Sequence, residues 1–293
     1  MCGVDSNLLG DIRRALAEGG EVVLGEIHDN PVHHLVRSAA IKEFGGSAQK
    51  PALVFEQFRA DQQAGLDAFA DLKTKSPNDA TLAEFKRLTG WDKSGWQQYN
   101  YDPLFEAAID AKLPLYAGDV TRDAIMKVAK EGESALPADE RARLKLDLPL
   151  GQKLDNASLD EIVEAHCNTM PKEALGGMAF AQRYRDASLA DALLNAAGKH
   201  GSAILIAGNG HVRTDRGVPW YIRQRAPDKK VVSVMLVEVE DGKNDPESYV
   251  PRNPDGKPAA DYIIFTPGVA GRPDPCEKMR AKSGTQSGTQ SGP

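Results

Sequence analysis

Two short turns of one type, Gly-x-x-His, carry the side chains of this chain that are best suited to chemistry. One turn is Gly25-Glu26-Ile27-His28 and the other is Gly208-Asn209-Gly210-His211. Each follows a short apolar run that is typical of a buried strand. A third such run, Ala52-Leu53-Val54-Phe55, is followed by Glu56. Two imidazoles and two carboxylates in one cleft can bind a divalent metal or activate a water molecule.

The strands before these turns predict where the side chains meet. In an open parallel sheet, residues just past the carboxyl ends of the strands converge on one crevice, where such folds bind ligands. We therefore expect Glu26, His28, Glu56 and His211 to share a cleft. There they would act as metal ligands, or as a hydrolytic site in which an imidazole is the general base and the carboxylates orient it. The alternative is that the turns only hydrogen-bond to each other and connect neighbouring strands.

Apolar periodicity predicts the elements that position this cleft. Short strands alternate with helices in the first part of the chain, as in a mostly parallel α/β sheet flanked by helices. From about 130 to 199 the strand pattern is absent, which predicts a smaller, all-helical insert before the fourth strand. Within it, Ser158-x-x-Glu161 is a capping box that predicts a helix start. We expect an α/β domain over 1–271 and a disordered low-complexity tail over 272–293.

Composition excludes several classes of protein. The net charge of −6 over 293 residues, without a basic stripe, argues against nucleic-acid binding. No apolar run approaches the ~20 residues that span a bilayer. Cys2, Cys167 and Cys276 form no CxxC, so we expect neither a disulfide framework nor a zinc knuckle. A start without a leader predicts a cytoplasmic protein. Cys2 directly after Met1 would instead suit a lipid anchor on that cysteine.

Five stretches of the sequence resemble one family. They are Val-Leu-Gly-Glu-Ile-His-Asp-Asn-Pro-x-His-His, Val-Phe-Glu-Gln-Phe, Trp-x-x-Tyr-x-x-Asp-Pro-Leu-Phe, Gln-Arg-Tyr-Arg-Asp-Ala-Ser-Leu-Ala and Ala-Gly-Asn-Gly-His-Val-Arg-x-x-x-Gly-Val-Pro. The likeness runs from about Val22 to Val239. In this region the chain resembles the ChaN-like proteins, which are haem-binding, iron-regulated bacterial proteins of the wider Tiki/erythromycin-esterase superfamily.

The resemblance implies a haem-binding protein of bacterial iron or haem acquisition, located in the envelope and often anchored there as a lipoprotein. It implies that the haem is held through a tyrosine ligand. It also implies an alternative, because the Tiki and erythromycin-esterase relatives are hydrolases that use the Gly-x-x-His cleft. This sequence keeps the cleft residues of those hydrolases, so haem binding and hydrolysis both remain open.

A bound haem needs an apolar slot, an axial ligand and nearby cations for its propionates. By residue type, the candidate contacts are Tyr99, Tyr101, His166, Tyr184 and Arg185. Each also has an ordinary structural role: packing for the rings, and for Arg185 an ion pair that connects the insert to the sheet. The absence of C-x-x-C-H excludes covalent haem attachment. A homodimer with haem between its protomers would need an exposed apolar face, which the periodicity does not reveal.

Overall fold

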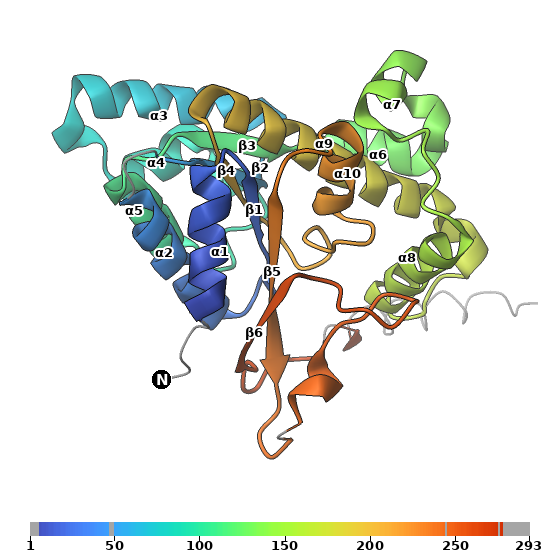
Figure 1. Cartoon of the computed structure of the whole chain (residues 1–293). Coiled ribbons are helices and arrows are strands. Elements are labelled where there is room, and N and C mark those ends of the chain that lie inside the picture. The colour runs from blue at the N-terminus through green and yellow to red at the C-terminus, as the bar shows by residue number, and fades with distance from the viewer. Residues whose placement is uncertain (1–5, 47–49, 244, 275, 278–293) are drawn as a thin grey trace, which may run out of the picture.

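The computed structural model describes residues 6–46, 50–243, 245–274 and 276–277. Within these residues, six strands form a single sheet in the order β3-β2-β4-β1-β5-β6, and all neighbouring strands are parallel (Figure 1). The strands are β1 (Glu21–Leu24), β2 (Ala52–Arg59), β3 (Leu115–Asp119), β4 (Ala203–Ile206), β5 (Val231–Val239) and β6 (Tyr262–Pro267). This sheet confirms the predicted α/β class.

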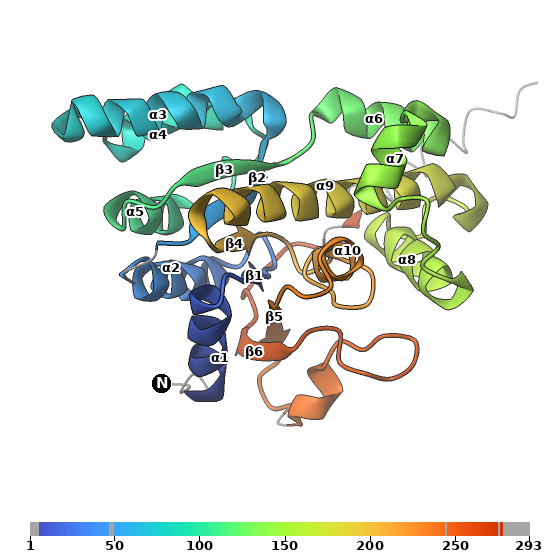
Figure 2. The same cartoon turned by 45° about the horizontal axis from the view of Figure 1, so that its top comes forward.

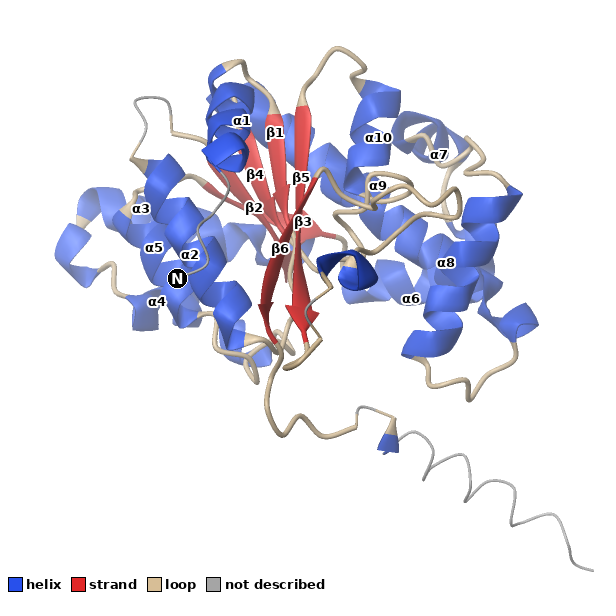
Figure 3. Cartoon of the chain, turned by 60° about the horizontal axis from the view of Figure 1, so that its bottom comes forward, coloured by secondary structure: helices blue, strands red, loops and turns tan. Residues whose placement is uncertain are grey.

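Helices cover the sheet on both sides (Figure 3). They are α1 (Ser6–Ala17), α2 (Pro31–Gly45), α3 (Gln63–Lys75), α4 (Leu82–Thr89), α5 (Asp102–Asp110), α6 (Arg122–Glu131), α7 (Ala138–Leu144), α8 (Gln152–Ala165), α9 (Gly176–His200) and α10 (Val218–Arg225). Helices α1 to α5 pack on one face of the sheet, and α6, α7, α9 and α10 pack on the other. The sheet therefore separates two apolar cores.

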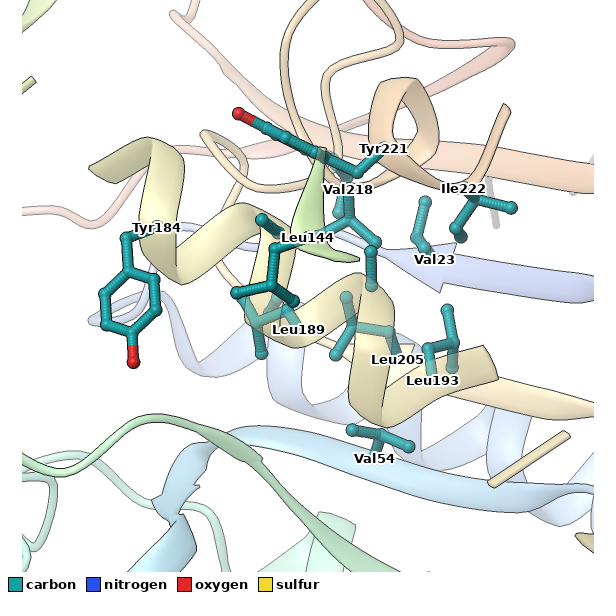
Figure 4. Packing of buried hydrophobic residues seen from close by; sticks show 14 of the residues in the cluster. Val23, Val54, Leu144, Tyr184, Leu189, Leu193, Leu205, Val218, Tyr221 and Ile222 are labelled. Carbon is teal, nitrogen blue, oxygen red and sulfur yellow. The ribbon is translucent and has the colours of Figure 1, made fainter. Parts of the chain in front are cut away.

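Strand alternation decides which core each side chain enters. In β2, Leu53 and Phe55 pack on the α1–α5 side, whereas Val54 packs on the α9 side. Successive side chains of a strand point to opposite faces, so Glu56 falls on the α9 side and Gln57 on the α1–α5 side. Figure 4 shows Val54 of β2 in the α9-side core, together with Leu189 and Leu193 of α9 and Leu205 of β4.

The chain between β3 and β4 is helical, as predicted, but the last helix of this insert packs directly on the sheet. Helix α9 lies along the sheet (Figure 2) and packs against β2, β3 and β4. The capping-box prediction was wrong, because α8 begins at Gln152 and Ser158 is buried in its interior. Gly151, whose φ of +94° suits glycine, precedes the helix and sets its actual start.

A disulfide joins Cys167, just after α8, to Cys276 beyond β6, with their Cα atoms 5.4 Å apart. The spacing of the cysteines predicted no disulfide framework, and this bond shows that the prediction was wrong. Two cysteines 109 residues apart are brought together only by the tertiary fold, which spacing does not reveal. Arg272 also forms ion pairs with Asp29 and Glu238. The start of the predicted tail is thus fastened to the domain, while 278–293 and Cys2 lie outside the described residues. Among the described helices, none has the length and apolar character of a membrane span.

Candidate functional site

The two Gly-x-x-His turns lie side by side because β1 and β4 are neighbouring strands. The main-chain N–H of Asn209 donates to the carbonyl of Glu26 at 2.9 Å, which connects the turns directly. Asn30 then caps α2 by accepting from Val32 N, and Pro31 takes the first helical position. The side-chain amide of Asn30 also donates to Glu238 at 2.7 Å, so the turn that carries His28 is held at both ends.

Glu26 is buried just past the carboxyl end of β1, and its Oε1 atom accepts several hydrogen bonds. The Tyr101 hydroxyl donates at 2.5 Å, His28 Nδ1 lies at 2.8 Å, and the Gln57 amide donates at 3.1 Å. Arg37, which is also buried, forms an ion pair with Oε2. Because a carboxylate only accepts hydrogen bonds, the contact with Glu26 places the imidazole hydrogen of His28 on Nδ1 and leaves the lone pair on Nε2.

Glu56 anchors a second cluster on the α9 side of the sheet. Its Oε2 accepts from Gly208 N at 2.6 Å, and its Oε1 accepts from Arg185 Nη2 at 2.7 Å. The same Oε1 lies 3.2 Å from His211 Nε2, while His211 Nδ1 lies 2.6 Å from Asp186 Oδ1. Both nitrogens of His211 therefore face carboxylates.

The charges in this cluster stabilise one another. Burial opposes the imidazolium form of His211, but Glu56 and Asp186 outweigh it and raise the pKa of His211 to about 9. Burial also opposes the Glu56 carboxylate, yet His211 and Arg185 hold the pKa of Glu56 well below its ordinary value. At neutral pH His211 is thus a buried imidazolium whose two N–H groups are both directed at acids.

His28 lies between the two clusters and is the accessible member of the four predicted cleft residues. Its side chain is 31% exposed, whereas those of Glu26, Glu56 and His211 are almost fully buried. Burial lowers the pKa of His28, so the imidazole is neutral at pH 7. The ring packs against Trp96, with 4.7 Å between the ring centroids.

The four predicted residues do meet at the carboxyl edge, but most of their polar atoms are paired with protein groups. Within the described part of the chain, no group of three or more His, Cys, Asp or Glu side chains is arranged to hold a metal ion. The divalent metal that the sequence suggested therefore has no site among the residues described.

Three of the five candidate haem contacts point into the protein. Tyr101 is fully buried, and burial raises the pKa of its hydroxyl. Tyr184 is buried on α9, and burial raises its pKa to about 12. Arg185 binds Glu56 and Asp119, each at 2.7 Å. It therefore has the structural role of connecting α9 to the sheet.

The other two candidate contacts, Tyr99 and His166, are partly exposed. Tyr99 lies beside Trp96, with ring centroids 6.3 Å apart. His166 follows the end of α8, and its Nδ1 lies 2.8 Å from the carbonyl oxygen of Ile162. Both rings are accessible from solvent. Tyr99 belongs to the loop before α5, and His166 belongs to the segment after α8.

Several residues that shape the site were not found by sequence reasoning. The Gln57 amide donates to Glu26, Arg37 forms an ion pair with it, and Asp186 pairs with His211. Strand alternation could have identified Gln57, because it places residues 56 and 57 on opposite faces. The pairing of Asp186 depends on the rotation of α9 against the sheet, for which the sequence gives no clear signal.

A cavity of about 200 Å³ lies next to the cluster of Glu56, His211 and Asp186. It is lined by residues of α8, of α9 and of the second Gly-x-x-His turn, among them Gln182, Asp186 and Gly210. Pockets for drug-sized ligands usually measure about 300–1,000 Å³. This cavity is therefore too small to enclose a haem, and it suits a smaller group.

Fold and site together define a class of parallel α/β proteins with paired Gly-x-x-His turns at the carboxyl edge of the sheet. A family model described as haem-binding uptake, Tiki superfamily, ChaN, matches residues 12–222, which is most of the chain. The chain belongs to this family. No curated protein sequence matches it.

Comparison with solved structures adds one match that shows the same fold. ChaN of Campylobacter jejuni, a structure described as showing cofacial haem binding, is 19% identical with a TM-score of 0.63, over 83% of this chain and 88% of that one. An erythromycin esterase in its open conformation is 14% identical with a TM-score of 0.42, over 96% of this chain and 84% of that one. The Campylobacter structure confirms the architecture.

Proposed function

We propose that this protein binds haem and acts in bacterial iron or haem acquisition. The observation that carries the proposal is its membership of the ChaN haem-uptake family over residues 12–222. The carboxyl edge of the sheet supports it, because His28, Trp96 and Tyr99 place partly exposed rings there. Rings of this kind suit the flat face of a macrocycle, and imidazole or phenol oxygen suits its iron.

Titration of the purified protein with haemin tests this function. We expect a Soret band that saturates at a fixed ratio of haem to protein. Saturation distinguishes a site from the non-specific adsorption of haem on apolar surface, which rises without a plateau. A titration without a plateau would contradict the proposed function.

The disulfide supports a location in the bacterial envelope. Disulfides persist in oxidising compartments such as the periplasm and are rare in the cytosol. We therefore propose that the protein works in the envelope. We also propose a lipid anchor on Cys2, because the ChaN-like proteins that the chain resembles are often lipoproteins. Mass spectrometry of the protein from membranes would detect the lipid. Unmodified Cys2 in the cytosolic fraction would contradict this location.

We also propose that two copies associate when haem is bound, since the Campylobacter ChaN structure is described as binding haem cofacially. Light scattering of the protein as it elutes from a size-exclusion column, with and without haemin, measures its molar mass directly. We expect the mass to double on saturation with haemin. An unchanged monomer mass would contradict the dimer and leave haem binding intact.

Hydrolysis is the second candidate, and one contact favours it. A neutral, accessible imidazole held by a buried carboxylate, as His28 is by Glu26 at 2.8 Å, is the arrangement of a general base. A panel of esters and peptides should then be hydrolysed by the wild type and not by His28→Ala. Equal rates for the two proteins on every substrate would exclude this function.

A further inference from the structure

An apolar groove of about 650 Å³ lies where β3, the strand at one edge of the sheet, begins. Its buried floor is formed by Leu66 and Phe69 of α3 and by Leu113, which precedes β3. Ile109 and Leu115 add apolar lining that is partly exposed. The volume falls in the range of about 300–1,000 Å³ that is usual for pockets that bind small molecules.

Three lysines surround this groove with positive charge. Lys73 and Lys112 line it, and Lys50 lies close enough to repel Lys73. Two of them also contact the end of α5, where Lys73 donates to the carbonyl of Ile109 and Lys50 to that of Ala111 at 2.7 Å. Because a carbonyl is neutral, these contacts do not cancel the charge of the ammonium groups.

The charges at the rim of the groove are incompletely balanced. Asp110 is the acidic residue among those that line it, and it offsets the repulsion at Lys73 in part. Burial and the repulsion from Lys112 and Lys50 nevertheless lower the pKa of Lys73. An anion beside these amines would relieve that repulsion, so the groove combines an apolar floor with a preference for negative charge at its rim.

We propose that this groove binds a fatty acid, with the alkyl chain on the apolar floor and the carboxylate between Lys73 and Lys112. An ammonium group has three N–H donors and forms charge-assisted hydrogen bonds with carboxylates. Lys73 uses a donor on Ile109 and keeps others for a ligand. The inference is independent of haem binding and adds a second ligand to the protein.

The lining of the groove does not fit haem. A haem iron is held by an axial ligand such as tyrosine, histidine, cysteine or methionine. None of these residue types occurs among the described residues that line the groove. The groove is therefore a separate site, and its ligand can be tested without haemin.

Calorimetric titration of the full chain with decanoate, below the concentration at which it forms micelles, tests the site. We expect a single decanoate to bind per chain. Binding should weaken as salt is added, because ions screen exposed charges. Decylammonium has the same alkyl chain and the opposite charge, and it should not bind.

Three variants locate the binding. Lys112→Gln removes one charge from the rim and should weaken decanoate binding about two- to fivefold. Lys75→Gln is the matched control, because Lys75 is an exposed lysine of α3 that pairs with Asp71 and does not line the groove. Its affinity should equal that of the wild type. Ala70→Trp places a large ring in the groove from an exposed position of α3 and should abolish binding.

The possible outcomes each decide the proposal. A wild type without saturable binding overturns it and leaves the haem-binding function standing. Equal losses in Lys112→Gln and Lys75→Gln would mean that binding follows net charge, and undiminished binding by Ala70→Trp would mean that the ligand lies elsewhere, so either result overturns it. Tighter binding of decyl phosphate than of decanoate would overturn the carboxylate and assign the groove to a phosphorylated lipid. Thermal unfolding of each variant establishes that a lost affinity is not a lost fold.

Discussion

Gly208 lies so close to the imidazole of His28 that a β-carbon at this position would come within 2.7 Å of Nε2. The second turn therefore needs glycine for space, since the neighbouring ring fills the volume of any side chain. Gly208→Ala should push the imidazole from its position over the turn. We expect this crowding to lower the free energy of unfolding by about 1–3 kcal/mol, measured by urea unfolding.

Gly210 provides the matched control for this substitution. It belongs to the same turn, but a β-carbon there meets no atom within 4 Å. Gly210→Ala should unfold at the same urea concentration as the wild type. Equal stabilities for the two alanine variants would mean that the turn can accommodate a side chain at Gly208.

His211 should make stability depend on pH in the alkaline range. Its pKa is raised from 6.5 to about 9 in the folded protein. The stability it contributes is fully present below about pH 6.5 and is lost as pH rises through about 9, with a total on the order of 3 kcal/mol. Urea unfolding of wild type and His211→Gln at several pH values measures the difference, which should shrink toward pH 9.5.

Nuclear magnetic resonance gives a check on His211 that does not require a stable variant. At pH 8 both ring nitrogens of His211 should still carry hydrogen. His28, His33, His34 and His200, whose pKa values are lowered, should carry hydrogen on one ring nitrogen only. A ring of His211 that is already neutral at pH 7 would contradict the charge pattern of the cluster. The free energies of unfolding of the wild type and of His211→Gln would then differ by the same amount at every pH.

The sequence predicted the sheet and the meeting of the four cleft residues because both follow from local patterns. Apolar runs and glycine turns locate the strand ends, and parallel strands bring those ends to one edge. The division into two clusters was not predicted. It arises because Glu26 and Glu56 point to opposite faces of the sheet, and this depends on the register of each strand. The Cys167–Cys276 pair depends likewise on long-range proximity.

Glu21 is expected to destabilise the protein above neutral pH. It is fully buried in β1, and burial raises its pKa from 4.5 to about 7, with Lys229 as a partial offset. The folded state therefore holds the proton more tightly, and stability falls as pH rises from about 4.5 through 7.

Glu21→Gln should remove this loss of stability at high pH. The amide of glutamine has nearly the shape of the protonated acid, but it does not ionise. At pH 8 the variant should be more stable by about 2–3 kcal/mol, and at pH 4 the two proteins should be equal within error. Chemical unfolding at both pH values provides the measurement. A variant that is less stable at pH 8 would show that the Glu21–Lys229 contact outweighs the cost of burying the charge.

The disulfide should stabilise the folded domain, because it joins residues 109 positions apart and so restricts the unfolded chain over a long loop. Bonds of this kind contribute about 2–4 kcal/mol, which corresponds to roughly 5–15 °C in the melting temperature of a domain this size. Cys276→Ser should melt lower by that amount and should not respond to reductant. The wild type should fall to the same temperature when reduced. A wild-type melting temperature unaffected by reductant would show that the bond between Cys167 and Cys276 does not hold the C-terminal segment to α8.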